Sequence, residues 1–416
     1  MNELPVGRRV AQWRVRRNMT QQQFADRLGK SKSWVDKVER GVRRLERVSN
    51  LREVAETLRI DVEVLLAARP VRPTPVAAGV DGVRTALARY HLPGADRPPL
   101  VEELGARLGH AEQSYRHARY PALLAVLPGV LDAVREVHAA RPGATDALLV
   151  SVYALIALVL VKVDQGELAW LAADRGMTVA LAAPDPQLAG VATVSLSQAL
   201  RSRGRRRSAL DAALVAADRI GTHDGSPTRA LRGTLLLQAA LAAAGGGDER
   251  LARQSLDQAA TIARDIGPNA AAGPGPGPGP GPGPGPGPGP GAEGCGGAGS
   301  GGVGFGRAAV EAARVVADAA LGDVTTATAR HERLVAGDEW RWLPPEHRAA
   351  YLLDVARAYA LAGDMHRAGR AVLDAERTAR SEVHDRPAVR KLVAVVWRSA
   401  DAPTGLAQLA ATLRVT

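Results

Sequence analysis

The chain has 416 residues, 46% of them apolar and 23% charged, a balance typical of a folded globular protein with two or three domains. It has 54 Lys and Arg against 43 Asp and Glu, which gives a net charge of +11. The single cysteine, Cys295, excludes an intrachain disulfide and a cysteine metal cluster, and it fits a reducing cytoplasm.

The positive charge is concentrated near the N-terminus. Residues 1–70 hold 16 Lys and Arg against 9 Asp and Glu, a net charge of +7. Three of the five lysines in the chain, Lys30, Lys32 and Lys37, fall within eight residues. A basic block of this kind is the electrostatic footprint of a nucleic-acid-binding segment, although a solvated Arg-rich surface has the same composition.

Five short helices are predicted between residues 4 and 68. The first covers about residues 6–17, with Val10, Trp13 and Val15 as candidates for its buried side. Thr20 begins the second helix as N-cap, and Gln23 three residues later completes a capping box. The core-facing residues of this second helix are expected to be Phe24, Ala25 and Leu28.

A tight turn at Gly29 separates the second helix from the third. Ser31 is the expected N-cap of this third helix, which runs to residue 40 with Val35 and Val38 facing inward. Two further helices, near residues 51–58 and 61–66, would close the small core.

The outer face of the third helix carries candidate base-reading residues. Helical spacing places Lys32, Ser33 and Lys37 together on this face, opposite the inward valines. A lysine ammonium is a donor suited to O6 and N7 of guanine. The pattern therefore predicts that this helix enters the major groove.

Other residues around the third helix suit the DNA backbone. The Ser31 hydroxyl and the positive N-terminus of the helix favour a phosphate, and Gln21 at the start of the second helix is placed to reach one. The basic run of Arg43, Arg44 and Arg47 suits phosphates or the minor groove.

These residues resemble the phage-repressor (Cro/C1, or Xre) type of helix-turn-helix domain, a five-helix lambda-repressor-like fold. The segments MTQQQFADRLGKSKSWVDKVERG and LREVAETLRIDVEVLL carry the resemblance across residues 4–68. It implies a double-stranded DNA operator as partner, with bases read by Lys32, Ser33 and Lys37 and phosphates held by Gln21 and Ser31. Trp34 departs from the small polar residue often found at its place; it would touch a thymine methyl, pack on the sugar-phosphate, or brace the helix. A domain used only for protein contact is the alternative.

The rest of the chain is predicted to be a helical solenoid. A Pro-rich linker is expected at residues 69–80, and then Ala- and Leu-rich helical patterns break at Gly, Pro or Asp about every 20 residues. This spacing predicts four to six helical hairpins of 35–45 residues, in blocks 81–272 and 306–416. No strand-like alternation persists, so the whole protein is expected to be all-α.

The repeat is clearest between residues 351 and 379. The small residues Ala356, Ala368 and Ala375 lie where two antiparallel helices must approach closely, and Gly363 and Asp364 form the turn and the next N-cap. The spacing resembles the tetratricopeptide repeat (TPR).

Residues 273–305 are predicted to be a disordered Gly/Pro-rich insert. Strict Gly-Pro alternation removes backbone donors and adds chain entropy, which disfavours helix and sheet. The apolar run at residues 147–161 is too short for the ~20 residues that span a bilayer, so a buried helix and no membrane contact are expected.

The joint architecture resembles actinobacterial regulators that pair this domain with a TPR-like C-terminal region; RAAYLLDVARAYALAGDMHRAGRAVLDAE and RPAVRKLV carry the likeness. It implies a cytoplasmic, nucleoid-associated transcriptional regulator, with a TPR-like domain that dimerises and senses a small molecule, peptide or protein. The alternative is a TPR-type protein-protein adaptor with weak or vestigial DNA binding. The sequence shows no catalytic motif and no metal-ligand spacing, so we expect no enzyme activity, no cofactor and no metal.

Overall fold

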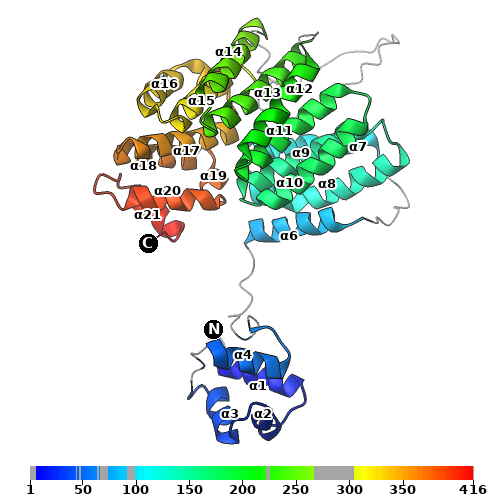
Figure 1. Ribbon diagram of the computed structural model, residues 1–416, viewed down its shortest axis with the longest axis vertical. Coiled ribbons are helices and arrows are strands. Elements are labelled where there is room, and N and C mark those ends of the chain that lie inside the picture. Colours follow the sequence, from blue (N-terminus) through cyan, green and yellow to red (C-terminus); the bar gives the residue numbers. More distant parts are fainter. Residues whose placement is uncertain are drawn as a thin grey trace, which may run out of the picture. The chain divides into compact units, whose positions relative to one another are not determined.

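The computed structural model describes residues 6–43, 45, 48–62, 65, 74–90, 99–221, 225–266 and 304–415 (Figure 1). Every regular element in these residues is a helix, and none is a strand, as expected of an all-α protein. The chain divides into two compact units, residues 1–74 and residues 75–416. Each unit is described by itself.

The first unit contains α1 (Val6–Arg16), α2 (Gln21–Arg27), α3 (Lys32–Glu39) and α4 (Val48–Leu58). Their inward faces form one small core, with Val10, Phe24, Ala25, Leu28, Val35, Val54, Leu58 and Leu65 all buried. The expected fifth helix, residues 61–66, is described only at Asp61, Val62 and Leu65; the rest of it lies outside the described residues.

One core prediction for α1 is wrong. The Val15 side chain is 61% exposed, whereas Val10 is 1% exposed and Trp13 is half-buried. At about 100° per residue, Val15 lies about 140° around the helix from Val10 and therefore faces solvent.

The second unit is a stack of helices, connected mostly by short turns. Its α-helices are α6 (Pro75–Ala88), α7 (Val101–Arg116), α8 (Tyr120–Ala140), α9 (Asp146–Lys162), α10 (Gly166–Ala182), α11 (Pro186–Ser202), α12 (Arg206–Ile220), α13 (Ser226–Gly245), α14 (Glu249–Ile266), α15 (Arg307–Ala320), α16 (Val324–Ala336), α17 (Pro345–Leu361), α18 (Met365–Thr378), α19 (Arg380–His384), α20 (Pro387–Trp397) and α21 (Leu406–Thr412). A 3-10 helix, η2 (Asp338–Trp342), precedes α17.

Consecutive helices pack as hairpins through the stack, most extensively α9 with α10, α13 with α14, and α17 with α18. In the last of these pairs Gly363 has a φ of +83°, and the Asp364 carboxylate accepts from the Arg367 backbone N–H at 2.8 Å. Ala356, Ala368 and Ala375 are fully buried. The sequence therefore predicted the turn, the N-cap and the close helix approach of this TPR-like hairpin.

The first helix of the stack begins earlier than the sequence indicated. Pro75–Gly79, expected at the end of the linker, form the first turns of α6. Gly79 is buried against α8, and an added Cβ at this glycine would lie 2.6 Å from the Leu124 Cβ. A tertiary contact therefore makes this Pro-rich segment part of the helical unit.

Most of the Gly-Pro insert, residues 273–303, lies outside the described residues, as do Cys295 and the linker residues 69–73. Its expected end at residue 305 differs from the structure. The Phe305 ring is 5% exposed and lies directly over Gly233 of α13, so this residue belongs to the core.

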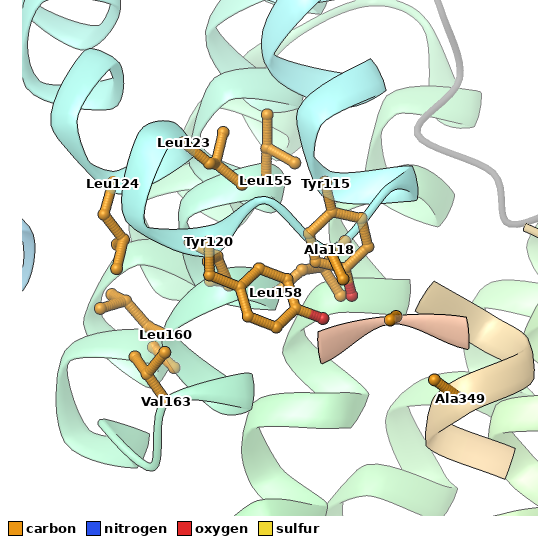
Figure 2. Packing of buried hydrophobic residues seen from close by; sticks show 14 of the residues in the cluster. Tyr115, Ala118, Tyr120, Leu123, Leu124, Leu155, Leu158, Leu160, Val163 and Ala349 are labelled. Carbon is orange, nitrogen blue, oxygen red and sulfur yellow. The ribbon is translucent and has the colours of Figure 1, made fainter. Parts of the chain in front are cut away.

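The apolar run at residues 147–161 forms most of α9, which is buried around almost its whole circumference. Figure 2 shows Leu155 and Leu158 of α9 beside Tyr115 and Tyr120, and Leu160 of the same helix beside Val163. In the described part of the chain no helix is long and apolar enough to cross a membrane. The run is instead the central packing element of the stack.

Candidate nucleic-acid interface

The turn between α2 and α3 is set by local hydrogen bonds. Thr20 and Gln23 form the expected capping box: the Thr20 hydroxyl accepts from the Gln23 N–H at 3.2 Å, and the Gln23 Oε1 accepts from the Thr20 N–H at 2.9 Å. Gly29 takes a φ of +61°, which favours glycine. The Ser31 hydroxyl then accepts from the Trp34 N–H at 3.1 Å and starts α3. These bonds fix the direction in which α3 leaves the turn.

The three residues expected to read bases are brought together on the outer face of α3. Lys32, Ser33 and Lys37 are all exposed, while Val35 and Val38 are buried on the opposite side. Among the described residues, the three exposed side chains form no hydrogen bond or ion pair. Their donors are therefore available to an external partner.

The acidic groups of α3 are neutralised within the domain. Asp36 pairs with Arg40 one turn later at 2.6 Å, and Glu39 pairs with Arg14 of α1 at 2.6 Å. The positive charges of Lys32 and Lys37 therefore remain uncompensated on this helix. An exposed helix face with two uncompensated cations favours binding to a polyanion.

Glu39 is a structural residue of this site that the sequence analysis missed. The residue is 5% exposed, and its carboxylate accepts from Nε and Nη2 of Arg14 at 2.6 and 3.0 Å. It also accepts from the Gln21 Nε2 at 2.8 Å. Arg14 donates in addition to the Met19 carbonyl at 2.7 Å. One buried carboxylate thus joins α1, the start of α2 and the end of α3.

The remaining site residues are placed as follows. Gln21 is half-buried, with its amide nitrogen bound to Glu39. The half-buried Trp34 packs against the small core, which favours bracing of α3 among the three expected roles. Arg43 is exposed directly after α3, where its backbone N–H donates to the Lys37 carbonyl at 2.9 Å. Arg44 and Arg47 lie outside the described residues.

Residues 5–68 match the family described as Helix-turn-helix domain. This segment is a helix-turn-helix domain. None of the curated proteins compared with the chain matches it significantly.

Two solved structures resemble the chain at low sequence identity. PlcR from Bacillus thuringiensis, solved in complex with the peptide PapR7 and DNA, is 12% identical, with a TM-score of 0.29 over 63% of this chain and 95% of that one. Aspartyl phosphate phosphatase F from Bacillus subtilis is 11% identical, with a TM-score of 0.41 over 91% of this chain and 94% of that one. Neither likeness is strong enough to transfer a function.

The helical unit holds a second group of functional interest, a buried charged cluster that the sequence analysis also missed. Lys162, at the end of α9, contacts the carboxylates of Glu346 in α17 and Glu382 in α19, the latter at 2.9 Å. Arg386 also pairs with Glu382. We call these four residues the junction cluster, because they join helices more than 180 positions apart in the sequence.

Two tyrosines extend the junction cluster toward α7 and α8. The Tyr120 hydroxyl donates to Glu382, and the Tyr115 hydroxyl lies 3.4 Å from Glu346. Their ring centroids lie 6.1 Å apart, and Figure 2 shows the two side chains next to each other. Burial and then the neighbouring glutamates raise the pKa of both tyrosines well above the usual value. Both hydroxyls therefore stay protonated and act as donors.

Proposed function

We propose that the protein is a sequence-specific DNA-binding transcriptional regulator, in which α3 enters the major groove of an operator. The observation that carries this proposal is the exposed face of Lys32, Ser33 and Lys37, held outward by a capped turn and by the buried Glu39. Binding rather than catalysis is the proposed activity, with no cofactor.

The proposed contacts divide into two kinds. Lys32, Ser33 and Lys37 face base edges, where a lysine favours guanine. Gln21, Ser31, Arg43 and Arg44 hold phosphates, which position the domain without reading the sequence. Because the Gln21 amide already donates to Glu39, the Gln21 side chain is ordered before DNA binds and loses little conformational entropy on binding. Trp34 supports the helix from behind.

The helical unit is proposed to dimerise and to respond to an effector. One domain with a single recognition helix covers a short half-site, so a homodimer on a palindrome would supply the missing affinity and specificity. Stacked helical hairpins offer an extended surface to a small molecule, a peptide or a protein. An effector would act by shifting the population between dimers that fit and dimers that miss the half-site spacing.

The test is selection of bound genomic DNA fragments with the purified full chain, compared with the variant Lys32→Ala/Lys37→Ala. We expect an enriched palindrome with half-sites about one helical turn apart. Each lysine contact to a base contributes ~1–3 kcal/mol, so the double variant should lose about a hundredfold in operator affinity. Lys391→Ala, an exposed lysine of α20, is the matched control and should leave affinity unchanged.

Two outcomes would contradict the proposal. Absence of any enriched sequence at moderate salt would favour the adaptor function, with partner capture by the helical unit as the next experiment. Equal enrichment by the double variant would show that α3 does not read the operator. Sedimentation of the chain with and without its operator tests dimerisation separately.

A further inference from the structure

A pocket lies in the helical unit between α7, α9, α11 and the start of α17. Its polar lining includes the carboxylates of Glu112 and Glu346 and the hydroxyls of Tyr115 and Ser195. Its apolar lining includes Leu155 and Leu158 of α9, which Figure 2 places beside Tyr115. The pocket has a volume of about 40 Å³ and is partly open to solvent. This room suits the head group of a ligand, since a water molecule takes ~30 Å³ in the liquid.

Glu112 brings an unpartnered buried acceptor to the lining of this pocket. Its Oε1 atom is buried and accepts no hydrogen bond within the described structure. Arg116 lies close enough to act on it electrostatically. Burial raises the pKa of this carboxyl, an effect that Arg116 opposes. A buried acceptor left without a donor is costly, and a ligand that supplies a donor removes this cost.

Glu346 shows what kind of donor the pocket accepts. It is 5% exposed, lines the same pocket and already binds one ammonium group, that of Lys162. Of the two carboxylates that line the pocket, Glu346 is paired with Lys162, whereas the buried Oε1 of Glu112 accepts no hydrogen bond in the described structure. An ammonium group is favoured at Glu112, because a charged donor makes a stronger hydrogen bond to a carboxylate than a neutral donor does, and an anion offers no donor at all.

We propose that this pocket binds a small aliphatic amine in its protonated form, with the ammonium group at Glu112 and the side of the Glu346 carboxylate, and the alkyl chain against Leu155 and Leu158. This inference rests on the proposed function, because it names the chemical class of an effector for the helical unit. It is tested without DNA, so its failure and that of DNA binding are distinguishable.

The position of the pocket gives the ligand a means of action. Glu112 belongs to α7 and Glu346 to α17, two helices that approach each other across the stack. A ligand that touches both carboxylates binds only while these helices are together. Its binding therefore favours the arrangement in which α7 and α17 are in contact over any arrangement in which they are apart.

The experiment is titration of the full chain with protonated n-propylamine, followed by saturation-transfer NMR and by thermal unfolding. The neutral and anionic probes of the same size are 1-propanol and propionate. We expect propylammonium to bind most tightly and to raise the Tm. Glu112→Gln should weaken it about tenfold, which corresponds to ~1.4 kcal/mol for a charge-assisted hydrogen bond.

Two further variants separate the pocket from the fold. Glu102→Gln makes the same change at an exposed position of α7 and should leave propylammonium binding unchanged. Ala154→Leu keeps every charge but fills the pocket that Ala154 lines, and it should abolish binding. The proposal is overturned if propylammonium fails to bind, if 1-propanol or propionate binds as tightly, or if Glu112→Gln or Ala154→Leu binds as the unchanged chain does.

Discussion

Two carboxylates of α3 differ sharply in what surrounds them. Glu39 is buried under three hydrogen bonds from Arg14 and Gln21, whereas Asp36 meets Arg40 at the exposed surface. A buried ion pair loses several kcal/mol when one partner is neutralised, because the other charge stays buried without compensation. An exposed pair contributes ~0–1 kcal/mol.

We therefore expect Glu39→Gln to lower the free energy of opening of α2 and α3 by about 3 kcal/mol. The matched change Asp36→Asn should lower it by less than ~1 kcal/mol. Amide hydrogen exchange of these two helices measures both, since it reports local opening apart from the helical unit. Equal losses in the two variants would mean that Glu39 does not anchor α3.

Among the helices, the approach of α6 to α8 depends on one missing side chain. A Cβ at Gly79 would lie 2.6 Å from the Leu124 Cβ, whereas a Cβ at Gly82, one turn later, would meet its nearest atom at 3.4 Å. The two glycines thus provide the same substitution in the same helix with different surroundings.

Gly79→Ala should destabilise the helical unit and detach α6. The new methyl group would clash with the Cβ and the backbone of Leu124, and neither can shift without distorting α8. Gly82→Ala should be neutral or stabilising by up to ~1 kcal/mol, because alanine favours helix over glycine. Thermal unfolding and limited proteolysis near residue 75 would measure the two effects. If Gly82→Ala lost as much stability as Gly79→Ala, the close packing of α6 on α8 at Gly79 would not explain the loss.

The junction cluster joins α9 to the C-terminal helices α17 and α19 of the helical unit. Burial alone would lower the pKa of Lys162, but Glu346 and Glu382 raise it above the usual value. Burial alone would likewise raise the pKa of Glu382, but Lys162 and Arg386 hold it below 4.5. A lowered carboxyl pKa stabilises the folded state above the unfolded pKa, and this stability is lost as the pH falls through the folded value.

Lys162→Met should cost about 3–5 kcal/mol, because Glu346 loses its counterion while Glu382 keeps Arg386. Adding Glu346→Gln to this variant removes the orphaned charge and should restore most of the loss. Urea unfolding at neutral pH measures both. If the double variant were no more stable than Lys162→Met, the loss would come from packing and not from charge.

The stability that the junction cluster gives the helical unit should also depend on pH. From neutral pH downward we expect the unit to lose stability below about pH 4.5, as the folded-state pKa of Glu382 is approached. The loss should be smaller in the double variant Lys162→Met/Glu346→Gln. There Glu382 keeps only Arg386 as a counterion, so its protonation breaks fewer ion pairs. A melting temperature that is flat from pH 7 to pH 3 would contradict this coupling.

Local sequence was sufficient for the elements of the DNA-binding domain and for its exposed face. Capping at Thr20 and Ser31, the turn at Gly29 and the outward position of Lys32 and Lys37 depend on residues a few positions apart, and helical periodicity carries that information. The same reasoning was enough for the turn at Gly363. It was not enough for Val15, because an apolar residue on a short helix does not by its type show which face the rest of the domain covers.

The tertiary structure decided which distant charges meet. Nothing near Glu39 in the sequence indicates that Arg14 lies against it, and nothing near Lys162 indicates Glu346 or Glu382. Ion pairs of this kind form between residues that the path of the chain brings together, and periodicity along one helix contains no information about that path. The exposed face of α3 is therefore predictable from one segment, whereas the Glu39 ion pair behind it and the junction cluster exist only once the helices have packed.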